Sequence, residues 1–262
     1  MSAMKTVLFE QQGQIGILTI DSPPVNALTM QVLGELEGII TAIYANSCKD
    51  LRALVLTGAG EKFFMAGADI SNFTNLTPES GIAFVKQHTD IFDRIAALPL
   101  PVICAVNGTA LGAGLELALA CDIRILSEKA KVGLPETGLG IYPGAGGTQR
   151  LARLVGAGNA KRMIFSAAHV TALEAHSMGI CEELAPPEAV LPQALELAAS
   201  IAANGPVAVA AAKRLIDEGL DCSIAEGMAL ENRAFGSLCD TWDKNEGACA
   251  FLEKRKPQFQ GK

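Results

Sequence analysis

Hydrophobic positions in the first half of the chain follow two different periods. Residues 4–10 and 14–20 are short β-type runs on either side of a Gln-Gln-Gly-Gln turn, which predicts a hairpin. Over residues 29–45 the apolar side chains recur at helical spacing, and residues 51–57 form an apolar run with the length of a buried strand. The predicted order is therefore strand, strand, helix, strand.

A second series of elements repeats this order. Its members are a helix over 89–97, a strand over 101–106, a glycine-rich loop, a helix that runs through Cys121, and a strand over 123–127. The repetition predicts an α/β fold built of ββα units.

The C-terminal end of the chain contains no strand pattern. After a proline-rich joint at Pro186 and Pro187, the apolar residues follow four helical patterns, over 190–203, 205–219, 223–239 and 245–256. We therefore expect a core of residues 1–192 and a helical subdomain of residues 193–262. This subdomain carries more apolar residues than a monomer normally exposes, which predicts that it is buried between subunits. The alternative is that it folds back on the N-terminal part of its own chain.

The composition is that of a folded protein with a hydrophobic core. The chain has 262 residues, of which 50% are hydrophobic and 19% charged, enough for one large domain or a domain with a small appendage. A net charge of -7 and the lack of a long lysine and arginine block argue against a nucleic-acid partner. The most basic stretch, at 254–256, suits either a phosphorylated small molecule or a solvated helix face.

Cysteine and histidine usage indicates neither a disulfide framework nor a metal site. The seven cysteines form no CxxC pair and several lie in apolar runs, which predicts buried thiols in a reducing compartment. The three histidines are scattered, so we expect no metal. The N-terminus lacks the apolar segment of a signal peptide, and the most hydrophobic region, 102–126, contains Asn107, Glu116, Asp122 and Arg124. We expect a cytoplasmic protein without a membrane partner.

Three glycine-rich loops contain the candidate chemistry. They span residues 63–70, 107–118 and 133–150, and each lies beside a predicted strand. Glycine lets backbone N–H groups approach a ligand closely, and a glycine loop that opens a helix directs those donors toward negative charge. The second loop lacks the third glycine of a dinucleotide site and the third loop lacks the lysine of a P-loop, so neither nucleotide motif is present.

Two glutamates in these loops are candidates for acid-base chemistry. Glu116 lies within the apolar run Leu-Glu-Leu-Ala-Leu-Ala, where a buried charge without a partner would be strongly destabilising. Taken alone, Glu116 fits equally well on the solvent-facing side of its helix. Glu136 alone fits simple exposure in its loop.

Together, the loops resemble the crotonase (enoyl-CoA hydratase/isomerase) superfamily over nearly the whole chain. The segments that carry the resemblance are residues 25–28, 66–70, 110–118, 121–123, 143–150, 246–247 and 251–256. The resemblance implies a crotonase-like spiral of repeated ββα units with a helical C-terminal trimerisation region. It also implies a homotrimer, or a homohexamer made of two trimers.

The resemblance assigns roles to individual residues. It places an oxyanion hole at the backbone N–H groups of Ala68 and Ala113, and the base and acid of a hydration reaction at Glu116 and Glu136. It implies no cofactor, because coenzyme A is part of the acyl-CoA substrate. The implied substrate contacts are Val25, Ala27, Ala66, Asp69, Ile70, Gly112, Gly144, Phe235, Phe251 and Lys254.

Three positions depart from the commoner family pattern. Ala113 stands where many relatives have glycine, which is compatible with the fold if its φ is negative. The segment 71–73 stands where many relatives place a lysine for coenzyme A, so we expect the phosphate contacts at Lys254 and its neighbours, including those of an adjacent subunit. Leu134 replaces a frequent polar residue and predicts a more apolar pocket.

The sequence therefore indicates an enoyl-CoA hydratase, which adds water reversibly across C2=C3 of a 2-enoyl-CoA to give a 3-hydroxyacyl-CoA. This addition needs a base for the water, an acid for C2 and donors for the thioester oxygen. A Δ3,Δ2-enoyl-CoA isomerase, or another crotonase-family lyase or isomerase, explains the fold equally well but leaves one glutamate without a role. A non-enzymatic scaffold has no reason to keep the glutamate pair.

Overall fold

The N-terminal hairpin forms one edge of the larger of two sheets. The structure, a computed structural model, describes residues 5–48 and 50–262, so Met4 of the first predicted strand lies outside it. β1 (Val7–Gln12) and β2 (Ile15–Ile20) pair antiparallel around a glycine turn. The first strand begins and ends later than the sequence pattern predicted.

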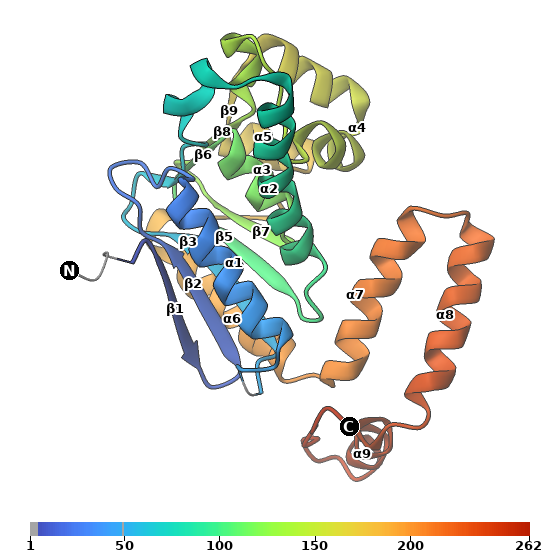
Figure 1. The fold of residues 1–262 in the computed structure, drawn as a ribbon. Helices are drawn as coiled ribbons and strands as arrows, with labels where there is room; N and C mark the ends of the chain where they lie inside the picture. The colour runs from blue at the N-terminus through green and yellow to red at the C-terminus, as the bar shows by residue number, and fades with distance from the viewer. Residues whose placement is uncertain (1–4, 49) are drawn as a thin grey trace.

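Parallel strands extend the hairpin into a six-stranded sheet with the order β1-β2-β3-β5-β7-β10. The added strands are β3 (Ala53–Gly58), β5 (Val102–Val106), β7 (Ile123–Ser127) and β10 (Glu183–Ala185). α1 (Met30–Tyr44) lies on one face of this sheet and α6 (Val190–Ala202) on the other (Figure 1). Side chains alternate along β3, so Leu54 joins the core beneath α1, whereas Val55 packs with α6.

The strands β3, β5 and β7 are each followed by a short strand of a second sheet. That sheet contains β4 (Phe63–Met65), β6 (Thr109–Leu111), β8 (Lys131–Gly133) and, antiparallel at its edge, β9 (His169–Thr171). The next helices are α2 (Pro78–Ala96), α3 (Ala113–Leu119), α4 (Gly147–Ser166) and, after β9, α5 (Ala172–Met178). The ββα repetition is thereby confirmed, although the three-residue strands are too short for a periodic pattern.

α2 begins at Pro78, well before the helix predicted over residues 89–97. Its N-terminus is capped by Thr77, whose hydroxyl accepts from the N–H of Ser80, and Pro78 occupies the first turn. The pattern missed this half of the helix because apolar residues such as Ile82, which is 67% exposed, form no buried stripe there.

The C-terminal helices form an arm that extends away from the two sheets (Figure 1). They are α7 (Pro206–Leu220), α8 (Ile224–Leu238) and α9 (Trp242–Leu252). Lys213 of α7 donates to Asp122 Oδ2 at 2.8 Å, and Arg52 donates to the carbonyl oxygen of Phe259 at 2.6 Å, which ties the arm to the body. α9 ends before residue 256, where the sequence pattern placed its end, because Lys254 adopts a φ of 57°.

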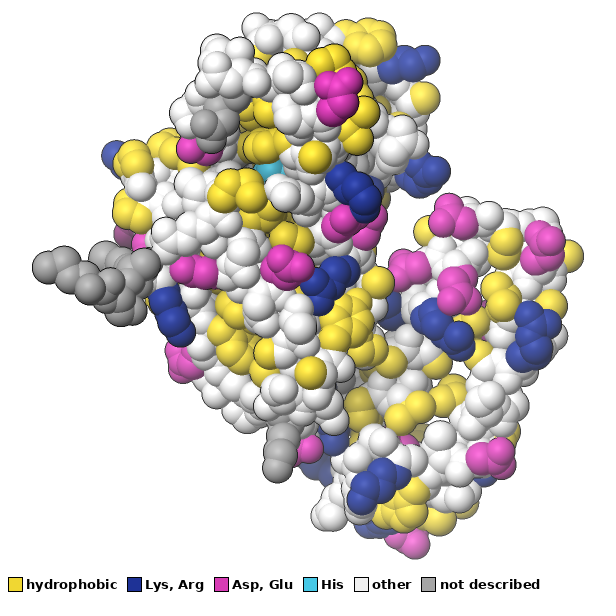
Figure 2. Space-filling model, viewed as in Figure 1, with side chains coloured by type: hydrophobic (Ala, Val, Ile, Leu, Met, Phe, Trp, Pro, Cys, Tyr) yellow, Lys and Arg dark blue, Asp and Glu magenta, His cyan; other side chains and the backbone are white. Residues whose placement is uncertain are grey.

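Many apolar side chains of the arm are exposed in the single chain. α7 contains no buried residue, and Figure 2 shows hydrophobic side chains on the arm and along the gap between the arm and the body. The large exposed hydrophobic residues of the arm are Ile216, Leu220, Ile224, Met228, Phe235, Trp242, Phe251 and Leu252. Cys239 and Cys249 are exposed as well, so the prediction of buried thiols is wrong for these two. It is confirmed for Cys104, Cys121 and Cys181.

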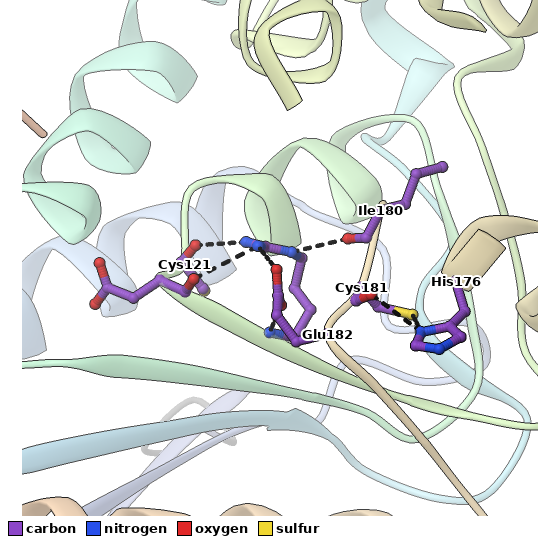
Figure 3. A network of polar contacts seen from close by, with 7 residues as sticks. Cys121, His176, Ile180, Cys181 and Glu182 are labelled. Carbon is purple, nitrogen blue, oxygen red and sulfur yellow. Dashed lines mark hydrogen bonds and ion pairs between the residues drawn. The ribbon is translucent and has the colours of Figure 1, made fainter. Parts of the chain in front are cut away.

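A buried arginine joins the large sheet to the segment before β10. Arg124 is 5% exposed, and its guanidinium donates to Cys121 O at 2.7 Å, to Ile180 O at 2.9 Å and to Glu182 Oε1 at 2.6 Å (Figure 3). Glu182 compensates a buried charge that would be strongly destabilising alone. Because Cys121 closely follows α3, the network also anchors the end of that helix.

Within residues 5–48 and 50–262, no single helix is both long and apolar enough to cross a membrane. One bent pair, Pro187–Ala202 with Pro206–Leu220 at 109°, passes by length and composition only. The same residues contain no group of three or more His, Cys, Asp or Glu side chains that could hold a metal ion.

Candidate active site

Two glycine-containing loops meet where the small sheet joins α3. An ideal Cβ on Gly112 would lie 3.7 Å from the Cα of Gly67, so the two backbones are in contact. Both glycines have a positive φ, +107° at Gly67 and +53° at Gly112, which L side chains rarely adopt. The residues that follow them, Ala68 and Ala113, present main-chain N–H groups that donate no hydrogen bond to any described residue. Ala113 is not among the residues with positive φ, so alanine fits there.

Glu116 is held inside the protein by two backbone donors. It lies in α3 with 3% of its surface exposed, so the interpretation of a solvent-facing side chain is wrong. Its Oε1 accepts from the N–H groups of Ala145 and Gly147, both at 2.8 Å. Burial raises the pKa of Glu116, whereas these two donors and the positive charge of Arg150 act to lower it. The donors and the arginine therefore offset part of the effect of burial, while the pKa of Glu116 stays above its ordinary value.

Glu136 lies in different surroundings, in the 3₁₀ helix η2 (Pro135–Leu139). The residue as a whole is half-buried, but its Oε2 is buried and has no hydrogen-bond partner among the described residues. Its Oε1 is only 2.7 Å from the position of an ideal Cβ on Gly112. Burial, and to a smaller extent the charge of Glu116, raises the pKa of Glu136 to about 7. Simple surface exposure is therefore wrong for this carboxyl, which is directed toward the loop before Ala113.

The sequence and the fold match known proteins along almost the full chain. Residues 10–262 match the enoyl-CoA hydratase/isomerase family. The chain belongs to this family. It is 44% identical over 254 residues to a short-chain-enoyl-CoA hydratase of Clostridium acetobutylicum, covering 97% of each chain. It is 41% identical over 261 residues to a crotonyl-CoA hydratase of Syntrophomonas wolfei, covering 99% of this chain and 100% of the relative.

Solved structures of the family share the fold. A crystal structure of an enoyl-CoA hydratase from Bacillus anthracis superimposes with a TM-score of 0.93 at 39% identity, covering 98% of this chain and 100% of the other. The crotonase-like α/β fold class is thereby confirmed. The trimerisation role of the C-terminal helices and the division at residues 192 and 193 stay predictions.

In this family member, most residues expected to contact substrate surround the two loops. The segment 25–28 runs beside 66–69: Ala66 N–H donates to Val25 O at 3.1 Å, and the bridge continues through Leu28 and Ala68. Asp69 caps the following helix η1 (Ile70–Asn75), since its carboxylate accepts from Ser71 N–H at 3.0 Å. The structure thus brings together the predicted contacts Val25, Ala27, Ala66, Asp69, Ile70 and Gly112. Gly144 lies instead against Val85 and Thr89 of α2, next to Ala145, which donates to Glu116.

Three predicted contacts lie elsewhere in the single chain. Phe235 in α8, Phe251 in α9 and Lys254 after α9 belong to the arm, and all three are exposed. In Figure 1, α9 lies at the far end of the molecule from α3 and β6. Within one chain these residues do not complete the site, so their role stays a prediction for an assembly of subunits.

One feature of the site was not predicted, and a second agrees with the sequence. The sequence contained the segment 143–150 as part of the resemblance, but nothing in it indicated that the N–H groups of Ala145 and Gly147 hold Glu116. The second feature is Leu134, which is fully buried: an ideal Cβ on Gly147 would lie 3.0 Å from its Cδ1 and 2.9 Å from Glu116 Oε1. Leu134 therefore packs beside Glu116, in agreement with the expected apolar pocket.

Proposed function

We propose that the protein is an enoyl-CoA hydratase, which adds water reversibly across C2=C3 of a 2-enoyl-CoA thioester to give a 3-hydroxyacyl-CoA. The observation that carries the proposal is the pair of carboxyls with opposite surroundings. Two N–H donors and a nearby arginine offset part of the rise in the pKa of Glu116 on burial, whereas Glu136 has a buried oxygen without a partner among the described residues and a pKa raised to about 7. A base and an acid at one site require this difference.

The proposed reaction uses both carboxyls and both backbone donors. Glu116 removes a proton from water as the oxygen bonds to C3, and the π electrons move through C2 to the thioester oxygen. The N–H groups of Ala68 and Ala113 hold the resulting negative charge, and a donor of this kind typically contributes about 3 kcal/mol to lowering the barrier. Glu136 then gives its proton to C2. The names of the two relatives above support an acyl group of short chain length.

The alternative within the family is a Δ3,Δ2-enoyl-CoA isomerase, which moves one proton between C4 and C2. One carboxyl suffices for that transfer. The presence of two, Glu116 with hydrogen-bond donors and Glu136 with an oxygen that has none among the described residues, favours hydration. The test is to mix the protein with crotonyl-CoA and with the 3-enoyl isomer. Loss of the enoyl-thioester absorbance from crotonyl-CoA, with 3-hydroxybutyryl-CoA as product, supports hydratase activity. A rise in that absorbance from the 3-enoyl substrate alone indicates an isomerase, and no change with either indicates a scaffold.

The pH dependence of hydration follows from the two carboxyls. Glu136 must be protonated to act as the acid, so we expect kcat/KM to fall as pH rises above its pKa of about 7. Glu116 must be ionised to act as the base, so kcat/KM also falls on the acidic side. Initial rates across this range should give a bell-shaped profile. A kcat/KM that keeps rising into alkaline solution would show that Glu136 is not the acid.

We also propose that the protein assembles through the C-terminal arm as a homotrimer, alone or paired as a homohexamer. The exposed apolar residues of α7 and α8 support this, because a monomer would leave them in water. In such an assembly Lys254 would reach the coenzyme A phosphates of a neighbouring subunit. We expect light scattering to give a mass near three or six chains. A stable, active monomer contradicts both the assembly and the shared coenzyme A site.

A further inference from the structure

Arg150 contacts the turn that holds Glu116 and has no role in the reaction as proposed. It belongs to α4, the helix that begins at Gly147, and its side chain is 21% exposed. Its Nη1 donates to Ala145 O at 3.2 Å, and its Nη2 donates to Asp93 Oδ1 of α2 at 2.5 Å. Ala145 thus accepts from Arg150 through its carbonyl and donates to Glu116 Oε1 through its N–H. Arg150 and Glu116 are connected through one residue.

The backbone between these contacts is shaped around the guanidinium. Gly146 has a φ of +105°, and a Cβ built on it would overlap Arg150 Nη1. The arginine therefore fills the space beside the turn 145–147 and limits how the turn can rotate. Both donors to Glu116, at either end of this turn, depend on that orientation. Loss of the arginine would leave the turn with neither its hydrogen bond nor its packing.

Charge acts in the same direction as geometry. Two charged groups other than Glu116 itself act at its position: the cation of Arg150 from α4, and Glu136 from η2 when it is ionised. Asp93 pairs with Arg150 from α2 and is 61% exposed. The positive charge opposes the effect of burial on the Glu116 carboxyl. A charged side chain that also holds the turn serves two purposes at once.

We propose that Arg150, braced by Asp93, is a positioning residue that keeps Glu116 oriented and ionised for the attack of water. The inference rests on the proposed function, in which Glu116 is the base. Arg150 touches the turn and Asp93, so it acts through Glu116. Its removal therefore affects kcat far more than KM.

Arg150→Gln tests this directly, because glutamine removes the charge and the contact with Asp93. We expect kcat for crotonyl-CoA hydration to fall roughly tenfold to a hundredfold, as for other losses of positioning, with KM changed less than about threefold. Without the cation the ionised form of Glu116 is less favoured, so the acidic limb of the pH profile moves to higher pH. Arg150→Lys keeps the positive charge but cannot contact Ala145 and Asp93 at the same time. The acidic limb of its pH profile should therefore match that of the wild type, and its kcat should lie between those of the wild type and Arg150→Gln.

Arg153→Gln is the matched control. Arg153 lies on the same helix, is exposed, and donates to the carbonyl and side chain of Gln149, one turn earlier. If Arg150→Gln has the kcat and acidic limb of this control, the proposal is wrong. If Arg150→Gln does not fold, the variants Asp93→Asn and Arg150→Lys test the positioning role of Arg150 in its place. Asp93→Asn should lower kcat severalfold because it removes the brace, and it should not move the acidic limb to higher pH, because the cation of Arg150 remains. An unchanged kcat in both Asp93→Asn and Arg150→Lys overturns the proposal.

A second readout separates this inference from the proposed function. In protein labelled with ¹³C at the glutamate carboxyls, the Glu116 signal can be assigned by its loss in Glu116→Gln and followed against pH. Its titration should move to higher pH in Arg150→Gln but not in Arg153→Gln, and an equal titration in both contradicts the inference. If the wild type hydrates no enoyl-CoA, the proposed function fails, while this titration still decides whether Arg150 controls Glu116.

Discussion

Replacing either glutamate by glutamine is expected to lower kcat for hydration by a factor of roughly 10² to 10⁴, the usual contribution of acid-base catalysis. At position 116 glutamine can still accept from the N–H groups of Ala145 and Gly147, so the turn stays in place while the base is lost. At position 136 glutamine keeps the size of the side chain but supplies no acidic proton to C2. Both variants should therefore bind substrate and fold normally.

The folding stability of Glu136→Gln is a control for misfolding, and the direction of its change with pH can be predicted. Burial raises the pKa of Glu136 from 4.5 to about 7, so the folded state resists ionisation that the unfolded chain permits. Its contribution to stability is full below pH 4.5 and is lost as pH rises toward and through 7. Glutamine does not titrate, so above pH 7 the variant should melt no lower than the wild type.

The two losses should not add in the double variant, because both carboxyls act in one reaction at one site. The measurement is kcat for Glu116→Gln, Glu136→Gln and the pair, with crotonyl-CoA as substrate and thermal melting as the control for folding. Near-wild-type turnover in either single variant would refute the mechanism. A double variant whose loss equals the product of the single losses would show that the two groups act in separate steps.

The fold was most predictable where an element is long and has a simple environment. α1 agrees closely with its pattern because Thr29 caps it and one stripe of residues, including Leu36 and Ile40, is buried. α4 was missed because Gly156, with a φ of 77°, interrupts the helix. The strands β4, β6 and β8 have three residues each, so two-residue alternation has no length in which to appear.

The site was less predictable because its main contacts involve backbone groups. All seven residues of α3 are buried, so the helix has no polar face from which the direction of Glu116 could be read. The donors to Glu116 are the backbone N–H groups of an alanine and a glycine 29 and 31 residues further along the chain. Every residue except proline has such a group, so the side chains at these positions do not reveal the contact. Only the resemblance to the family brought these loops together before the structure did. The contact of Arg150 with the turn at 145–147 could not be predicted from the sequence.

Gly112→Ala should nearly abolish hydration although the change adds one methyl group. The new Cβ would lie 2.7 Å from Glu136 Oε1, and the flexible carboxyl is the group that can move away. The φ of +53° is also unfavourable for alanine and costs roughly 1–3 kcal/mol of stability. Any relaxation of this strain rotates the peptide that presents the N–H of Ala113. Acid and oxyanion donor are thus displaced together, and we expect kcat to fall by about 10² to 10³.

Gly179→Ala separates the strain from the contact. Gly179 also has a positive φ, +81°, but lies at the end of α5 with nothing within 4 Å of its ideal Cβ. It should lose stability through its positive φ in thermal or urea melting and keep the kcat of the wild type. If Gly112→Ala retains the kcat of Gly179→Ala, then Glu136 does not act from its position against Gly112, and the proposed pairing of acid and oxyanion hole is wrong.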